Sequence, residues 1–236
     1  MRLEALLGCM LLLVGCASEK STSTPQVDRS KRAIHLSGGI EVDRDRGEVR
    51  VPARVGIDTG WIEQVACVQG SRDHESLLIV TAQPSTVHAG LLLLGLEPGH
   101  PGYWRFADPN GESPKVQRVS PVGSRVGIFV QSADASGQPR EQPISEWLET
   151  AQDGQSFPTQ PWVFGGSVFD SEDVYAADRS GSLVGLVTFG DEVLGLESIM
   201  ADQTGVDAAE WQARDAAMPS PGTEVTLIIR PWQESD

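Results

Sequence analysis

The stretch that says most about the fold is CVQGSRDHESLLIV, residues 67–80. Its first apolar run belongs to a longer segment, residues 61–69 (WIEQVACVQ), and its second run covers residues 74–80. Residues 70–73 (GSRD) lie between the two runs, and glycine, serine and aspartate favour turns. Two apolar runs of this length on either side of a short turn predict neighbouring antiparallel strands.

The same alternation of short apolar runs and turns continues in both directions along the chain. Upstream, residues 40–42 and 49–51 flank the charged stretch DRDRG and predict a hairpin. Downstream, we expect further strands at residues 126–131, 162–169, 183–189 and 224–230.

Helices are predicted to be few and short. The sequence PSTVHAGLLLLGLEPG, residues 84–99, offers Ser85 as an N-cap, an apolar stripe, and Gly95 or Gly99 as the end of the helix. Residues 144–151 and 207–217 predict two more short helices. The expected fold class is therefore α+β and strand-rich, with mostly antiparallel sheets and two or three short helices.

The N-terminus has the features of a bacterial lipoprotein. Residues 5–14 (ALLGCMLLLV) form an uncharged run of signal-peptide length, shorter than the roughly 20 residues that span a bilayer. The sequence LVGC then resembles a lipobox, in which the cysteine, here Cys16, receives the lipid. We predict a signal peptide over residues 1–15, a lipidated Cys16 with a flexible tether over 16–32, and a single globular domain over 33–236.

The expected anchor and the net charge limit the partners of this chain. Acyl chains on Cys16 would hold the protein on a membrane of the cell envelope, facing away from the cytoplasm. The formal net charge of −15 disfavours binding to nucleic acid and to anionic membrane surfaces. We therefore expect the membrane as a partner through Cys16 only, and an envelope protein or a small ligand as the partner of the domain.

Several motifs together resemble the YdjY-domain family. The two most specific are residues 67–80 and 84–99. The resemblance extends to WVFGGSVF, to Ala177-Asp178 before GSLVGLVTFGDEVL, and to the closing GTEVTLIIRP. It covers most of the predicted mature chain and implies a secreted or lipid-anchored bacterial domain whose biochemical activity is unassigned.

Cysteine usage limits the cofactors of the mature domain. The chain has three cysteines; Cys9 would leave with the signal peptide and Cys16 would carry lipid, so that Cys67 remains as the one thiol. No intramolecular disulfide is then expected. An iron–sulfur cluster needs about four thiolates, so the sequence predicts no such cluster.

The candidate site consists of Cys67, His74 and His88. If the strands at 61–69 and 74–80 form a hairpin, Cys67 lies opposite Ser76, and His74 lies diagonal to Cys67 on the same face. His88, in the first turn of the following helix, would pack on the same sheet. A cysteine near a histidine can be a nucleophile, and one cysteine with two histidines can bind zinc or copper. A free cysteine can also be an ordinary buried residue.

These alternatives lead to two functional hypotheses. The first is a binding or structural role without catalysis, with no cofactor, because the sequence contains no complete catalytic or cofactor motif. The second is a metal-binding or thiol-dependent enzyme centred on Cys67, His74 and His88. The distance between Cys67 and the two histidines separates the two hypotheses.

Overall fold

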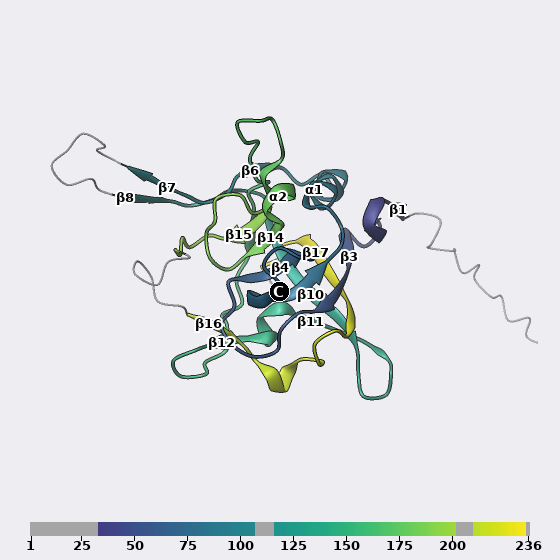
Figure 1. Cartoon of the computed structure of the whole chain (residues 1–236). Coiled ribbons are helices and arrows are strands. Elements are labelled where there is room, and N and C mark those ends of the chain that lie inside the picture. Colours follow the sequence, from purple (N-terminus) through teal and green to yellow (C-terminus); the bar gives the residue numbers. More distant parts are fainter. Residues whose placement is uncertain (1–32, 107–115, 202–209, 235–236) are drawn as a thin grey trace, which may run out of the picture. The chain divides into compact units, whose positions relative to one another are not determined.

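Strands dominate the computed structural model, which describes residues 33–106, 116–201 and 210–234 (Figure 1). Eight strands close into a barrel in which β5 returns to pair with β3. Two neighbouring pairs, β4–β5 and β14–β15, are parallel, and the others are antiparallel. Around the barrel the order is β3 (Glu48–Val55), β17 (Glu224–Pro231), β10 (Arg125–Ala133), β13 (Trp162–Phe164), β15 (Leu194–Leu196), β14 (Ser182–Gly185), β4 (Gln64–Val68) and β5 (Ser76–Val80). This confirms the strand-rich, mostly antiparallel fold class.

The remaining strands extend the barrel or form small sheets beside it. The predicted hairpin at residues 40–51 is present, because β2 (Glu41–Asp43) pairs antiparallel with β3, and β1 (Ile34–His35) adds to β2. β11 (Pro139–Pro143) pairs antiparallel with β10. Three small two-stranded sheets complete the set: β6 (Pro98–His100) with β9 (Val122–Gly123), β7 (Tyr103–Phe106) with β8 (Val116–Val119), and β12 (Leu148–Thr150) with β16 (Trp211–Ala213).

The helix predicted at residues 84–99 is α1 (Pro84–Leu93), which ends just before Gly95 at φ 83°. It begins two residues earlier than expected, with Gln83 instead of Ser85 as N-cap and Pro84 in the first turn, where proline is well tolerated. The second helix, α2 (Ala176–Ser180), was not predicted. Short 3-10 turns occur at η2 (Ser37–Gly39), η3 (Asp73–Glu75), η4 (Ile144–Trp147) and η5 (Asp215–Ala217).

Two predicted helices are wrong where the structure describes them. Residues 144–151 form no α-helix. The first four make the 3-10 turn η4, whose buried Ile144 and Trp147 pack on the barrel, and Leu148 then begins β12. Part of the helix predicted at 207–217 lies outside the described residues. Its described part contains β16, which pairs with β12 instead of forming a helix.

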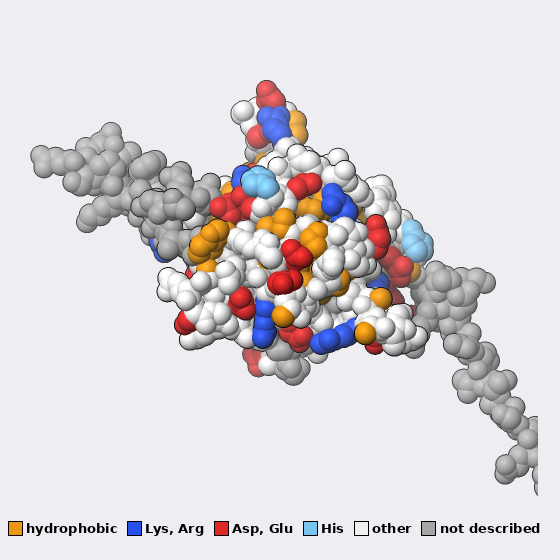
Figure 2. Space-filling model, turned by 60° about the horizontal axis from the view of Figure 1, so that its bottom comes forward, with side chains coloured by type: hydrophobic (Ala, Val, Ile, Leu, Met, Phe, Trp, Pro, Cys, Tyr) orange, Lys and Arg blue, Asp and Glu red, His pale blue; other side chains and the backbone are white. Residues whose placement is uncertain are grey.

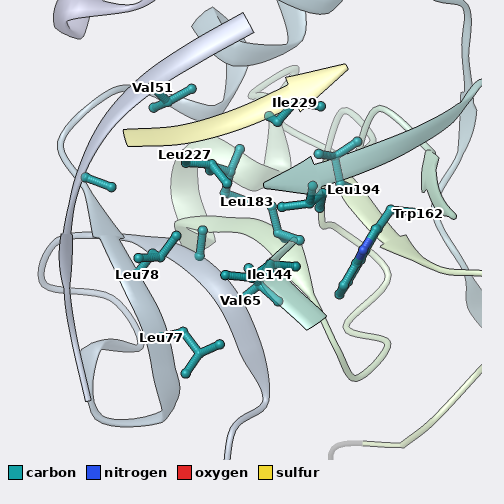
Figure 3. Close-up of a cluster of buried hydrophobic side chains, with 14 of the residues drawn as sticks. Val51, Val65, Leu77, Leu78, Ile144, Trp162, Leu183, Leu194, Leu227 and Ile229 are labelled. Atoms are coloured by element: carbon teal, nitrogen blue, oxygen red, sulfur yellow. The ribbon is translucent and has the colours of Figure 1, made fainter. Parts of the chain in front are cut away.

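The barrel interior is filled by apolar side chains that alternate along the strands. In β3 the residues Val49, Val51 and Val55 are fully buried, while Arg50 and Arg54 between them face outward. Val51, Leu227 and Ile229 point into a common cluster in Figure 3. Full burial of such a side chain contributes about 1.5–3 kcal/mol, so this cluster is the main source of stability.

Two short connections between parallel neighbours shape one side of the barrel. Residues 69–75 join β4 to β5, and residues 186–193 join β14 to β15. The connections meet where the guanidinium carbon of Arg72 lies 3.8 Å from the centre of the Phe189 ring. This cation–π contact fixes the two connections against each other.

The N-terminal predictions lie outside the described residues. The predicted signal peptide over residues 1–15, the lipidated Cys16 and the tether over 16–32 all precede the first described residue, 33. They stay predictions. In the part of the chain that the structure describes, no helix is long and apolar enough to cross a bilayer.

Candidate functional site

Cys67 lies in β4, and its side chain is fully buried beneath the connection from β4 to β5. Its Sγ lies 3.8 Å from Asp73 Oδ1, and the side chains of Ser76 and Ser71 also face the thiol. Burial raises the pKa of the Cys67 thiol, because removal from water disfavours the thiolate more than the nearby hydroxyls favour it. A buried thiol of this kind has neither the charge nor the access of a nucleophilic cysteine.

The structure contradicts the predicted hairpin between the strands that carry Cys67 and His74. β4 and β5 are parallel, so Cys67 pairs with Ile79, and Ser76 pairs with Gln64. The connection between them runs back to the start of β4, because β5 must also lie antiparallel to β3 to close the barrel.

His74 lies in the 3-10 turn η3 at the end of that connection. Its side chain is 80% exposed, and its Nε2 lies 3.6 Å from Glu75 Oε2. None of the contacts described for Cys67 involves His74. The described contacts of this exposed imidazole are limited to one carboxylate, and they include no second ligand or nucleophile with which His74 could bind a metal ion or act as a catalytic base.

His88 lies on α1 and faces the segment that follows β13. Its Nδ1 is 2.8 Å from the Tyr175 hydroxyl and 3.2 Å from the Gly166 carbonyl oxygen. The ring also packs edge-on against Phe164, with centroids 4.9 Å apart. Burial lowers the pKa of His88, which favours the neutral imidazole.

The hydrogen bonds around His88 assign its tautomer. The Tyr175 hydroxyl donates to the Gly166 carbonyl oxygen at 2.7 Å, and this uses its only proton. The proton between Tyr175 and His88 must therefore come from Nδ1. Nε2 is then an acceptor, and it has no hydrogen-bond partner among the described residues. The site presents one oriented imidazole nitrogen that can accept a hydrogen bond or a proton.

A second contact joins α1 to α2 next to this imidazole. The backbone N–H of Ser85 donates to Asp178 Oδ1 at 2.8 Å, and the Ser85 hydroxyl donates to Oδ2 at 2.6 Å. A carboxylate at this place satisfies an N–H of the first helical turn and is favoured by the helix dipole. Ser85 therefore links two helices instead of capping α1 with its side chain.

The turn at Gly166 and Ser167 fits closely under His88. Both residues have a left-handed backbone, with φ of 83° and 59°. A Cβ on Gly166 would lie 2.6 Å from Pro98 Cβ and 3.1 Å from His88 Cε1, so glycine is required here. The Ser167 hydroxyl donates to the Asp191 carbonyl oxygen and accepts the N–H of Ala177.

Residues 167–175, named here the apolar loop, lead from this turn to α2. The loop is the projection above α2 in Figure 1. It exposes Val168 to 41%, Phe169 to 68% and Val174 to 38%. Its base is held by Ser167 and Tyr175, so the imidazole site and the exposed apolar side chains belong to one structure.

The comparison with protein families decides the identity of the domain. A family described as the YdjY domain matches residues 40–230, most of the chain. The chain belongs to the YdjY family. No curated protein and no solved structure is significantly similar to it.

Three of the motifs that resemble the family meet at one place in this YdjY domain. The helix motif supplies Ser85 and His88, the WVFGGSVF motif supplies Gly166 and Ser167, and the segment before GSLVGLVTFGDEVL supplies Asp178. The other specific motif, residues 67–80, builds the separate connection over Cys67.

The zinc or copper site that we considered for Cys67, His74 and His88 is not assembled in this YdjY domain. The three side chains have no neighbour in common among the contacts described above. Across residues 33–106, 116–201 and 210–234, no group of three or more His, Cys, Asp or Glu side chains could hold a metal ion. The parallel pairing of β4 and β5 removes the hairpin register by which we had placed His74 diagonal to Cys67.

Glu192 is a buried carboxyl group next to the site. It is 2% exposed, and its Oε2 accepts the backbone N–H groups of Phe189, Gly190 and Asp191. Burial, together with the charge of Asp191, raises the pKa of Glu192 to about 7. Through these hydrogen bonds Glu192 stabilises the connection from β14 to β15. The same connection accepts the hydrogen bond of the Ser167 hydroxyl at the Asp191 carbonyl oxygen and contacts Arg72 through the Phe189 ring.

Sequence reasoning selected His88 but missed its partners in this YdjY domain. Tyr175 and Gly166 lie 87 and 78 positions away in the sequence, and no local pattern indicates that they meet. The one available signal was the pair of glycines before Ser167, because adjacent glycines often mark a left-handed turn.

Proposed function

We propose that this YdjY domain is a binding domain that a lipid on Cys16 holds on the outer side of a bacterial membrane. The anchor is supported by the uncharged run at residues 5–14 and by the sequence LVGC that ends at Cys16. The polar stretch that follows would let the domain stand off the membrane as a flexible tether does.

The apolar loop is the observation that carries the binding role. Exposed apolar side chains on a projection do not stabilise the domain, and such patches mark interaction sites. The neighbouring His88 offers one acceptor nitrogen, and its contacts within the described residues include no nucleophile. The Tyr175 hydroxyl donates to Gly166, and burial raises its pKa, so it stays protonated.

The substitution Cys16→Ser tests the anchor. The native chain should incorporate labelled palmitate and sediment with membranes. The variant chain should incorporate no fatty acid, and it should appear in the soluble fraction or remain as uncleaved precursor. A Cys16→Ser chain that is still cleaved and still incorporates palmitate would exclude Cys16 as the anchor.

Native gel electrophoresis of the full chain, solubilised from its own membranes, tests the binding role. We expect migration as a complex larger than the chain itself, and loss of that complex with Phe169→Ser. Trp61→Ser, which also removes an exposed aromatic ring, is the matched control. A native chain that migrates as a monomer under mild detergent would contradict the binding role.

A further inference from the structure

We propose that the apolar loop inserts Phe169 into an apolar pocket on a partner protein whose rim is positively charged. This inference rests on the proposed binding function and adds the chemical class of the partner. It is drawn from the exposure, the rigidity, the charge and the shape of the loop.

Two aromatic rings lie side by side in the apolar loop. Phe169 and Tyr175 are bridge partners across the loop, and their rings pack edge-on with centroids 5.6 Å apart. Val168 and Val174 precede these two residues in the sequence and are also exposed, on the other face of the loop, because side chains alternate along an extended chain. Phe169, exposed to 68%, is the most prominent large apolar side chain of the loop. A ring of this size is the usual anchor of a protein interface.

The loop is already fixed in one conformation. The Asp170 carboxylate accepts the backbone N–H groups of Glu172 and Val174, and the Asp170 N–H donates to the Val174 carbonyl oxygen. Arg179 on α2 forms ion pairs with Asp170 at 3.0 Å and with Glu172 at 2.6 Å. A partner that binds this loop would pay little conformational entropy to order it, which favours binding.

The apolar loop carries a net negative charge. Asp170, Glu172 and Asp173 lie between Phe169 and Val174 in the sequence, and Arg179 pairs with the first two. Asp173 has no ion-pair partner among the described residues. Figure 2 shows acidic, basic and apolar side chains together on the projection at its top. A cationic rim on the partner complements this arrangement and would accelerate association.

Shape and net charge distinguish between the possible occupants. The loop projects from the domain in Figure 1, whereas sites for small molecules are concave. Two copies of a chain with a net charge of −15 would repel each other, and an anionic lipid surface would repel the loop. A protein with a cationic surface and an apolar pocket is the occupant that fits all three observations.

Site-specific photo-crosslinking in the native host tests this inference. The full chain would carry p-benzoylphenylalanine in place of Phe169, and a second version would carry it in place of the exposed Trp61. We expect an adduct with a different protein from position 169, and a contact peptide rich in lysine and arginine when the adduct is mapped by mass spectrometry.

Charge substitutions make the crosslinking result specific. Asp173→Asn keeps a residue that tolerates the left-handed backbone at φ 62°, and combined with Glu172→Gln it removes two charges from the loop. We expect the adduct yield to fall about fivefold at low salt, because complementary charges raise the rate of association. Asp215→Asn in η5 is the matched control and should leave the yield unchanged. Thermal unfolding of each variant checks that it is folded.

The other outcomes overturn the inference in distinguishable ways. An adduct between two copies, an adduct with lipid, or a partner peptide without basic residues would contradict the proposed partner class but keep the binding role. An unchanged yield in the double variant would also contradict the cationic rim. The absence of an adduct at position 169, with or without one at position 61, would contradict the binding function of the loop itself.

Discussion

His88 Nδ1 and the Tyr175 hydroxyl lie 2.8 Å apart, and both groups also contact the carbonyl oxygen of Gly166. This triangle joins α1 to the end of the apolar loop. It sets the imidazole tautomer and also fixes the loop, so the two properties should change together when the triangle is altered.

Tyr175→Phe should release the loop and change the imidazole. The variant loses two hydrogen bonds of a half-buried hydroxyl, and we expect a loss of about 1–2 kcal/mol in the free energy of unfolding. In the native domain, long-range proton–nitrogen NMR spectra should show the His88 proton on Nδ1. A native His88 with its proton on Nε2 would contradict the assigned hydrogen-bond directions.

Gly166→Ala should destabilise the domain more than an equivalent substitution elsewhere. The new Cβ would clash with Pro98 in addition to the cost of φ 83°, and we expect a loss of about 2–4 kcal/mol. Gly137→Ala is the control, because φ there is 79° but nothing lies within 4 Å of the added Cβ. Its expected cost is about 1 kcal/mol in urea unfolding. Equal costs at the two positions would mean that the turn under His88 is not tightly packed.

Glu192 should make the domain less stable as the pH rises. The ordinary pKa of the carboxyl is 4.5, and in the folded domain it is about 7. Between these values the folded chain holds a proton that the unfolded chain has released. The contribution of Glu192 to the free energy of unfolding should therefore be largest below about pH 4.5. It should fall by about 3 kcal/mol as the pH rises through 7.

Glu192→Gln isolates this contribution. His88 has a lowered pKa and gives a pH dependence of the opposite sign, so the informative quantity is the difference between the native domain and the variant. Urea unfolding of both proteins from pH 5 to pH 8 should show the variant gaining in relative stability at the alkaline end. A difference that does not change with pH would show that Glu192 is ionised throughout.

Cys67 should be unreactive in the folded domain. Its thiol is fully buried and its pKa is raised, so alkylation should require unfolding and should follow the urea unfolding curve. Cys67→Ala should cost about 1–2 kcal/mol, the usual range for a small cavity. Rapid alkylation of the folded chain at neutral pH would contradict this expectation and would favour the enzyme hypothesis.

Local sequence patterns predicted the elements whose partners are close in the chain. The β2–β3 hairpin follows from the charged turn at residues 43–47, and α1 follows from its apolar stripe. The pairing of β4 and β5 was predicted wrongly, because the short segment 69–75 has the composition of a hairpin turn. Its path is set instead by distant strands, since β4 must pair with β14 and β5 with β3.

In the candidate site, too, the residues set by local sequence could be predicted and those set by distant segments could not. His88 was selected because a histidine near a cysteine can support chemistry, but its actual neighbours come from α2 and from the turn after β13. The helix α2 has only five residues, too few for a helical period to be visible in the sequence. Cys67 and His74 were placed together by a register that does not form.

Accessibility of residue 171 in native membranes tests the proposed binding role most directly. Ser171 is an exposed residue of the apolar loop, and its replacement by cysteine keeps the Phe169 ring. The full chain would carry Ser171→Cys or, as control, Trp61→Cys, and would be treated with a maleimide that does not cross membranes. Cys67 should stay silent because it is buried, and Cys16 because of its lipid. We predict that position 171 is protected in membranes and becomes reactive after purification, whereas position 61 reacts in both. Equal reactivity of position 171 in membranes and after purification would contradict a role of the apolar loop in binding.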